Sequence, residues 1–268
     1  MPLDLSKLSQ GDGKNIRVAV IDSGIQSDHD WVGGRLITSY QTIETKEDQI
    51  EVVETKPQDP VGHGTACAGQ IRRYAPNVDI ISVRILSPTL KATSSALLAA
   101  LRWLPEISVN VVNLSLSTMR KQLALEIGLA IDDLYEKNVT CICARGYHKT
   151  GKAYPTNFAN TIAVTYSELI ESDLKFRPKD LVEFDGPGVQ TRVAWKESST
   201  RVVDGSSYAC PLVTGLACRM LSIDPTLTPY EIKSAIKQYA IKRRSGWHQP
   251  WMDQVEKEPT TSNASSSA

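Results

Sequence analysis

The chain has 268 residues, of which 41% are hydrophobic and 22% are charged, and its formal net charge at pH 7 is zero. This balance gives no sign of the basic surface that nucleic acid binding requires. The sequence also contains no apolar run of the roughly 18 residues that are needed to cross a bilayer. We therefore expect neither a nucleic acid partner nor a membrane partner.

Apolar, β-branched runs alternate with helical patterns along most of the chain. The expected strands lie near residues 17–22, 79–86, 109–116, 139–144 and 161–165. The expected helices lie near residues 63–73, 94–104, 121–137, 207–222 and 229–239. This alternation, with nearly continuous apolar strands, predicts an α/β fold in which a mostly parallel central sheet carries helices on both faces.

The segments between these elements suggest one domain. Residues 1–15 read as an N-terminal lead-in, residues 16–244 as the domain, and residues 245–268 as a disordered tail that ends in polar, low-complexity sequence. The polar stretch 42–59 reads as a long solvated excursion within the domain. No internal repeat or linker divides the chain.

Cysteine usage and the N-terminus indicate a cytoplasmic protein. The five cysteines are Cys67, Cys141, Cys143, Cys210 and Cys218. An odd number in mostly apolar settings favours reduced, buried thiols over a disulfide framework. A zinc pair at Cys141 and Cys143 lacks a partner pair at ligand spacing, so we expect no metal site and no cofactor. The first residues show no basic start and no apolar core of the kind that marks a secretory signal.

Three motifs carry candidate chemistry. A buried strand ends in Asp22, His63 stands between two glycines at the start of a small-residue helix, and Ser207 begins a helix after Gly205. Each also fits an ordinary structural role, as a turn residue, a helix-capping histidine and a serine N-cap respectively. The other histidines, His29, His148 and His248, lack such a setting and are expected at the surface.

Together the three residues predict nucleophilic catalysis. A serine hydroxyl needs a base to take its proton, a histidine suits that task, and a buried carboxylate orients the histidine. The helix that follows Ser207 directs free N–H groups toward a developing oxyanion. A lipase or esterase would instead show a Gly-x-Ser-x-Gly motif with a later histidine, and the order Asp…His…Ser argues against it.

At these motifs the chain resembles the subtilisin-like serine peptidase family. The resemblance rests on Asp22-Ser23-Gly24, on His63-Gly64-Thr65 and on the run from Gly205 to Pro211, and it extends over about residues 16–239. It implies a subtilisin-like fold and peptide hydrolysis through an acyl-enzyme, with Asp22, His63 and Ser207 as the triad. It also implies that substrate pairs as an extended strand with two segments, Ser115-Leu116-Ser117 and Ala144-Arg145-Gly146.

The clearest departure from the family pattern is Tyr147. The family usually has an asparagine at this position, and its side chain donates to the oxyanion. Three outcomes stay open: a slow enzyme that relies on the Ser207 N–H and the Ser206 hydroxyl, a tyrosine hydroxyl that replaces the missing donor, or a site that binds peptides without cutting them. Another local alignment would bring His148 or Asn157 closer to the site.

Two further departures concern the segments around the first strand and the first helix. The connection 70–76 is too short for the calcium-binding loop found in many relatives, so we expect no calcium there. About fifteen residues precede the first strand, which leaves no room for a folded inhibitory prodomain. Folding without such a helper and origin from a larger parent chain both stay open.

Two classes of function follow. The first is a serine endopeptidase that acts on a peptide or protein in limited intracellular processing, such as the maturation of ribosomally made peptides, with a regulatory protein partner. The second is a catalytically weak or inactive peptide-binding or scaffold domain. Arg145 replaces a small residue near the expected primary pocket, where it would either attract an acidic substrate side chain or point to solvent, and the second expectation is preferred.

Overall fold

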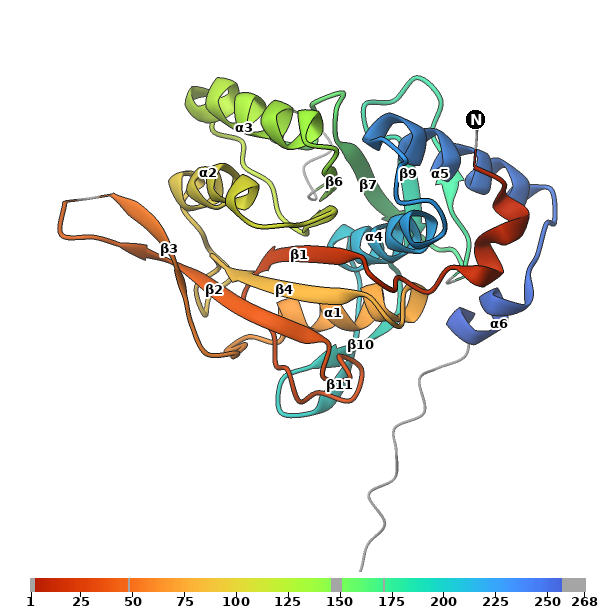
Figure 1. Cartoon of the computed structure of the whole chain (residues 1–268), viewed down its shortest axis with the longest axis horizontal. Coiled ribbons are helices and arrows are strands. Elements are labelled where there is room, and N and C mark those ends of the chain that lie inside the picture. The colour runs from red at the N-terminus through yellow and green to blue at the C-terminus, as the bar shows by residue number, and fades with distance from the viewer. Residues whose placement is uncertain (1–2, 48, 146–150, 171, 257–268) are drawn as a thin grey trace, which may run out of the picture.

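The computed structural model describes residues 3–47, 49–145, 151–170 and 172–256 (Figure 1). Within these residues, the main sheet has nine strands in the order β3-β2-β4-β1-β5-β6-β7-β9-β8, and β10 and β11 form a separate antiparallel hairpin. The strands are β1 Arg17–Asp22, β2 Leu36–Glu44, β3 Ile50–Glu54, β4 Asp79–Arg84, β5 Val111–Leu114, β6 Thr140–Ala144, β7 Ile162–Ser167, β8 Lys175–Phe176, β9 Phe184–Pro187, β10 Thr191–Trp195 and β11 Ser199–Val203.

Six α-helices and three short 3-10 turns connect these strands within the described part of the chain. The helices are α1 His63–Tyr74, α2 Ser94–Trp103, α3 Ala124–Glu136, α4 Ser206–Ile223, α5 Pro229–Arg244 and α6 Pro250–Glu256. The 3-10 turns are Leu5–Gln10, Leu104–Glu106 and Lys121–Leu123. None of the described helices combines the length and the apolar character that a membrane span requires.

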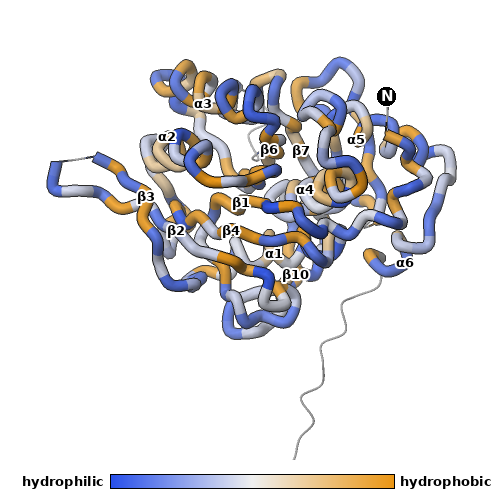
Figure 2. The backbone as a smooth tube through the Cα atoms, in the orientation of Figure 1, coloured by the Kyte–Doolittle hydropathy of each residue, from blue (hydrophilic) through white to orange (hydrophobic). Residues whose placement is uncertain are grey.

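The central strands bury side chains on both faces of the sheet. In β1, Val18 and Val20 contribute to the core that contains α1, α4 and α5, while Ala19 and Ile21 contribute to the core that contains α2 and α3. Successive strand residues point to opposite faces, so one fully apolar strand supplies both cores. Figure 2 shows hydrophobic backbone segments along these central strands. The predicted α/β fold, with a mostly parallel sheet covered on both faces, is therefore confirmed.

The order of the strands places a crevice at the end of β1. Strand β1 pairs in parallel with β4 on one side and with β5 on the other. After β1 the chain first forms the strands on the β4 side of β1, and it later forms the strands on the β5 side. Such a reversal opens a crevice at the carboxyl ends of the strands, where α/β proteins bind ligands. Asp22 is the last residue of β1 and lies at this point.

Three expectations from the sequence need correction. The stretch 42–59 was expected to be a solvated excursion, but it contains the end of β2 and all of β3, which pair with each other as an antiparallel hairpin. This hairpin belongs to the main sheet because β2 also pairs in parallel with β4. The segment expected as a disordered tail contains α6, whose Trp251 and Met252 are buried against the main core. His29 was expected at the surface but is buried. Its Nδ1 accepts from the Trp31 N–H, and its Nε2 lies 2.9 Å from the Ser199 carbonyl oxygen.

The five cysteines are all buried and unpaired, as the sequence predicted. Cys141 and Cys143 lie on β6 and face the α2–α3 core together, which follows from their spacing of two along a strand. Burial raises the pKa of the Cys141 thiol to about 12. The pair therefore behaves as small apolar side chains in this core.

Candidate active site

Strand β1 and helix α1 touch through their backbones next to Asp22 and His63. A side chain added at Gly64 would begin 2.0 Å from the carbonyl oxygen of Gly24, a distance that no real Cβ atom adopts. Gly24 itself has φ +105°, a conformation that favours glycine. The two glycines thereby let the carboxyl end of β1 and the first turn of α1 approach closely.

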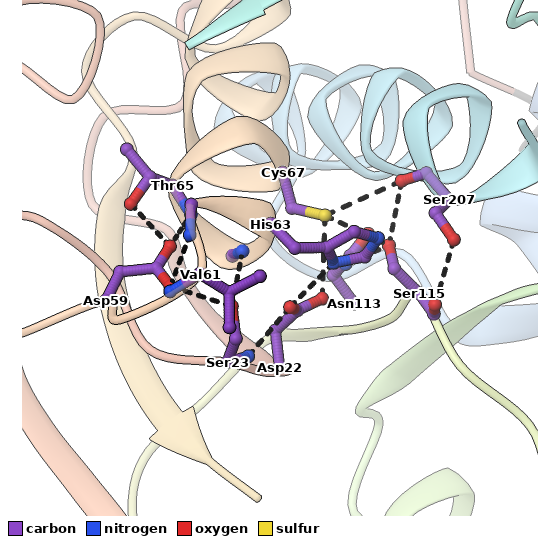
Figure 3. A network of polar contacts seen from close by, with 12 residues as sticks. Asp22, Ser23, Asp59, Val61, His63, Thr65, Cys67, Asn113, Ser115 and Ser207 are labelled. Atoms are coloured by element: carbon purple, nitrogen blue, oxygen red, sulfur yellow. Dashed lines mark hydrogen bonds and ion pairs between the residues drawn. The ribbon is translucent and has the colours of Figure 1, made fainter. Parts of the chain in front are cut away.

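This approach brings His63 onto Asp22. The His63 Nδ1–H donates to Asp22 Oδ1 at 2.7 Å, and both side chains are almost fully buried (Figure 3). A second bond reaches the same carboxylate oxygen from the Ser23 N–H at 2.7 Å. The hydrogen bond to Nδ1 leaves the other ring nitrogen, Nε2, free to accept a proton, which is the arrangement of a general base with its orienting carboxylate.

The surroundings of His63 favour its protonated form. Burial alone would lower the pKa of His63, but the Asp22 carboxylate outweighs burial and raises this pKa well above its usual value. Cys67 also touches the pair, through a contact of 3.6 Å between its Sγ and Asp22 Oδ2. Because burial and the nearby Asp22 raise the pKa of Cys67 to about 12, the thiol carries no charge at neutral pH. Asp22 is therefore the charge that holds the proton on His63.

Asp59 supports this pair and was not singled out by sequence reasoning. Its carboxylate is 9% exposed, and one oxygen accepts from the Ser23 hydroxyl and from the N–H groups of Val61 and Gly62 at 2.8–3.1 Å. The other oxygen accepts from the N–H and the hydroxyl of Thr65 at 2.9 and 2.7 Å. Asp59 therefore joins the end of β1 to the start of α1. In the sequence, its position four residues before His63 is the signal that could have identified it.

We expect Asp59→Ala to lower the free energy of unfolding by about 2–4 kcal/mol, because it leaves several buried donors without an acceptor. For a chain of this size, that loss corresponds to a fall in Tm of roughly 5–10 °C. Thermal unfolding followed by circular dichroism measures it. Asp28→Ala, at an exposed aspartate, is the matched control. A fall of less than 1 °C in the Asp59 variant would show that the network contributes no net stability.

Ser207 lies in the first turn of α4, opposite the end of β5. Gly205 precedes the helix with φ 146° and ψ 158°, and Ser206 and Ser207 open the helix. Ser115 follows β5, and its hydroxyl donates to the Ser207 carbonyl oxygen at 3.0 Å. Cys67 Sγ lies 3.5 Å from that same carbonyl oxygen. Asp22, His63 and Ser207, which are far apart in sequence, thus belong to one connected set of contacts through Cys67 (Figure 3).

The hydroxyl of Ser207 points away from His63 in this structure. It donates to the Ser115 carbonyl oxygen at 3.1 Å, and the contacts of the described residues include no hydrogen bond between it and the His63 ring. Ser207 is half-buried. In this rotamer its hydroxyl is therefore bonded to the segment that follows β5.

The two oxyanion candidates were Tyr147 and Ser206. Tyr147 lies outside the described residues, as does Gly146, which was expected to bind substrate, so the alternatives for Tyr147 stay predictions. Ser206 is described, is 5% exposed and occupies the first position of α4, next to the nucleophile candidate. The first turn of a helix carries N–H groups without intrahelical partners and the positive end of the helix dipole.

The described residues of the segments expected to bind substrate lie at the ends of the neighbouring strands β5 and β6. After Ser115, the chain continues through half-exposed Leu116 and Ser117, and Thr118 then exchanges two backbone hydrogen bonds of 2.8 Å with Tyr154. Ala144 ends β6 and is 2% exposed. The parallel pairing of β5 with β6 brings the ends of these two segments to the same edge of the sheet.

The side chain of Arg145 is held by contacts within the chain. Its guanidinium donates to Asn157 Oδ1 at 2.5 Å and to the Gly151 carbonyl oxygen at 2.6 Å, while its own N–H donates to the Val164 carbonyl oxygen. The arginine therefore ties the end of β6 to residues 151–157. Both of these acceptors are neutral and the side chain is half-exposed, so the attraction for an acidic substrate side chain stays a prediction. Asn157, considered above as a neighbour of the oxyanion, is occupied by this contact and by the Ala153 N–H.

Asp22, His63 and Cys67 form a group whose ligand atoms could surround a metal ion, since they lie within 4.8 Å of one another. The three side chains contact one another, and the high pKa of Cys67 leaves no thiolate to bind a metal at neutral pH. Their geometry fits a protonated hydrogen-bonded cluster.

A buried imidazole–carboxylate pair that shares its contacts with a serine at a helix start, at the switch point of an α/β sheet, defines a serine hydrolase.

Comparisons with known proteins agree with this class. The model of the subtilase family matches residues 13–265. Subtilisin DY of Bacillus licheniformis is 26% identical over 246 residues, which cover 85% of this chain and 84% of that protein. Thermitase of Thermoactinomyces vulgaris is 25% identical, with 86% and 83% covered. The extracellular serine proteinase of Thermus sp. strain Rt41A is 27% identical, and the match spans 93% of this chain but 62% of that protein.

A solved structure supports the fold in the same way. The crystal structure of a cold adapted subtilisin-like serine proteinase superposes with a TM-score of 0.69 at 24% identity, covering 84% of this chain and 81% of the other. The chain therefore belongs to the subtilase family, and it is a subtilisin-like serine peptidase, which acts on peptide or protein substrates.

Proposed function

We propose that this chain is a serine endopeptidase in which Ser207 is the nucleophile, His63 the general base and Asp22 the group that orients His63. The observation that carries the proposal is the 2.7 Å hydrogen bond between buried Asp22 and His63, in contact through Cys67 with the segment that holds Ser207. Each residue type fits its role, and each role is needed, because a serine hydroxyl is a weak nucleophile without a base.

The reaction proceeds in two halves. Once its hydroxyl turns from Ser115 to His63, Ser207 gives its proton to His63 Nε2 and attacks the peptide carbonyl carbon. The negative charge that develops on the carbonyl oxygen is stabilised by the first N–H groups of α4 and by Ser206. His63 then gives its proton to the leaving amine, and the acyl group stays on Ser207. A water molecule then gives a proton to His63 and attacks the acyl carbon. The bond between this carbon and Ser207 Oγ breaks, His63 returns the proton to Oγ, and the carboxylic acid leaves.

We further propose that the oxyanion hole is atypical, because Tyr147 stands where the family usually has asparagine. Tyr147→Asn restores an amide donor, and we expect it to raise kcat by about 100- to 1000-fold, the effect known for one such donor in subtilisin. Turnover of denatured casein by wild type and variant measures it. The exposed Tyr230→Asn on α5 serves as a matched control. An unchanged kcat would mean that another donor already serves the oxyanion.

The endopeptidase is proposed to act in limited intracellular processing under a regulatory partner. Five buried, unpaired thiols support a reducing location, although relatives such as the Thermus proteinase are named extracellular. The second candidate, a weak or inactive peptide-binding domain, is favoured by the Ser207 hydroxyl, which contacts Ser115 in place of His63.

Labelling with a fluorophosphonate probe separates the two candidates. An active serine hydrolase takes up one probe per chain, and mass spectrometry should locate it on Ser207. Subtilisin under the same conditions shows that the probe is reactive. If the folded protein stays unlabelled while subtilisin reacts fully, the endopeptidase proposal is wrong and the binding domain is preferred.

A further inference from the structure

A hollow of about 620 Å3 lies next to the segments that hold His63 and Ser207. It is bounded by the β10–β11 hairpin, by the starts of α1 and α4, and by Pro88 and Leu90 in the connection between β4 and α2. Val61, two residues before His63, and Tyr208, directly after Ser207, form its inner wall. Trp195, Lys196 and Arg201 form the wall contributed by the hairpin. None of these residues takes part in the chemistry proposed above, so the role of the hollow is open.

The lining of the hollow includes Val61 and Tyr208 but none of the three residues Ser115–Ser117. Figure 3 shows Val61 and Ser115 on the two sides of the His63 ring. The ring of Tyr208 packs on His63 with centroids 5.5 Å apart. The Trp195 ring lies 2.9 Å from the position that a side chain at Gly62 would occupy, so the hairpin reaches the residue next to His63.

This placement assigns the hollow to the leaving part of the substrate. The acyl part pairs with the Ser115–Ser117 segment and is transferred to Ser207. His63 then protonates the leaving amine, so the residues that follow the scissile bond extend past His63 and away from Ser115. An extended peptide advances about 3.3 Å per residue. The first three residues after the bond therefore span about 10 Å, which brings them along the hollow.

The outer wall of the hollow carries a positive charge that no described carboxylate neutralises. The Arg201 guanidinium stacks over Trp195 at 5.0 Å from the ring centroid, and no carboxylate in the described parts of the chain forms an ion pair with it. Lys196 adds a second cation, whose contact with exposed Glu197 is 3.9 Å long. The single carboxylate of the lining, Asp204, accepts the Gln190 N–H at 2.5 Å.

Stacking on Trp195 prepares Arg201 to bind a carboxylate. A guanidinium that lies over an aromatic face keeps its N–H edge exposed, and this edge matches the two oxygens of a carboxylate. The stack also restricts the side chain, so less rotamer freedom is lost on binding. An acidic side chain is the group that such a wall accommodates best.

We propose that Arg201 is a specificity-determining residue that selects an acidic side chain among the first three residues after the scissile bond. The proposal rests on the endopeptidase function proposed above. The expected preference for glutamate over glutamine at the responsible position is about three- to tenfold in kcat/KM, as suits a charged pair at a partly exposed site.

Fluorogenic peptides that differ only by glutamate, glutamine or lysine at each of these three positions test the proposal. Wild type should prefer glutamate at one of them, Arg201→Gln should reduce the ratio of glutamate to glutamine to about one, and Arg201→Glu should favour lysine. The wild-type preference should also weaken in 0.5 M NaCl, because salt screens an exposed pair. Arg192→Gln, on the same hairpin but outside the lining, should retain the wild-type ratio.

Two results would overturn the inference, and they are distinguishable. If wild type is labelled at Ser207 and cleaves the glutamine peptides, but shows no charge preference after the bond or keeps it in Arg201→Gln, Arg201 has no such role. If wild type neither takes up the fluorophosphonate nor cleaves any peptide, the endopeptidase function itself is wrong and the inference falls with it. A charge preference found only before the scissile bond would also contradict the assignment of the hollow.

Discussion

Replacing Ser207 by alanine is expected to lower kcat for peptide cleavage by roughly 10⁵- to 10⁶-fold, because it removes the hydroxyl on which the acyl-enzyme forms. His63→Ala should cost about as much, since without a base the hydroxyl of Ser207 keeps its proton. Residues that act as a unit are not additive, so the double variant should be no slower than either single variant. Hydrolysis of a fluorogenic peptide, with long incubations for the slow variants, measures these rates.

Ser245→Ala, at the exposed end of α5, is a suitable control for these two variants because it removes a hydroxyl far from the site. Thermal unfolding of each variant shows whether its fold is intact. A Ser207→Ala protein that keeps more than one tenth of the wild-type kcat would contradict the assigned nucleophile. A double variant that is a further 10³-fold slower would contradict the shared role of the two residues.

Asp22→Asn is expected to lower kcat by about 10⁴-fold while leaving the backbone in place. The amide is similar in size to the carboxylate, but it neither stabilises the imidazolium that forms in the reaction nor fixes the productive tautomer of His63. Because the lost interaction is strongest in the transition state, KM should change little. Steady-state kinetics with the same fluorogenic peptide separates kcat from KM.

The same variant should change the pH dependence of kcat/KM in a defined direction. His63 acts as a base only when it is unprotonated, and Asp22 raises its pKa well above the usual value. Wild-type activity should therefore increase with pH until the alkaline range, as His63 loses its proton. Removing the Asp22 charge lowers the pKa of His63, so the acidic limb of the profile should move to lower pH. A limb that stays in place would show that another charge sets this pKa.

The sequence was sufficient for the parts of the fold that depend on local pattern. The strand near 17–22 and the helix start at His63 agree with the structure, because continuous apolar runs and dense small residues are compatible with few local structures. The hairpin of β2 and β3 was missed because its polar residues are stabilised by pairing with β4, which is distant in sequence. Helix α6 was missed because its apolar residues are few and are recognised only by the core they reach.

The same distinction applies to the candidate site. Motif spacing singled out Asp22, His63 and Ser207, and the structure connects them through Cys67. Motif spacing gave no sign of the rotamer of Ser207, since that rotamer depends on the Ser115 carbonyl oxygen. Motif spacing also gave no sign of the partners of Arg145, which lie in a segment that folds back onto β6. Side-chain direction and long-range partners are properties of the assembled chain.

The contact between Gly24 and Gly64 has a consequence for engineering this protein. The spacing between Asp22 and His63 is fixed by two main chains in direct contact, so neighbouring side chains have little scope to adjust it. At Gly64 even the smallest addition, a methyl group, would push the start of α1 away from the end of β1, and with it the imidazole from the carboxylate. At Gly24 a methyl group would collide with the Gln58 carbonyl oxygen and require a strained backbone. Selection from a library randomised at both positions for retained cleavage should return glycine twice, whereas catalysis can be tuned at hairpin residues farther away.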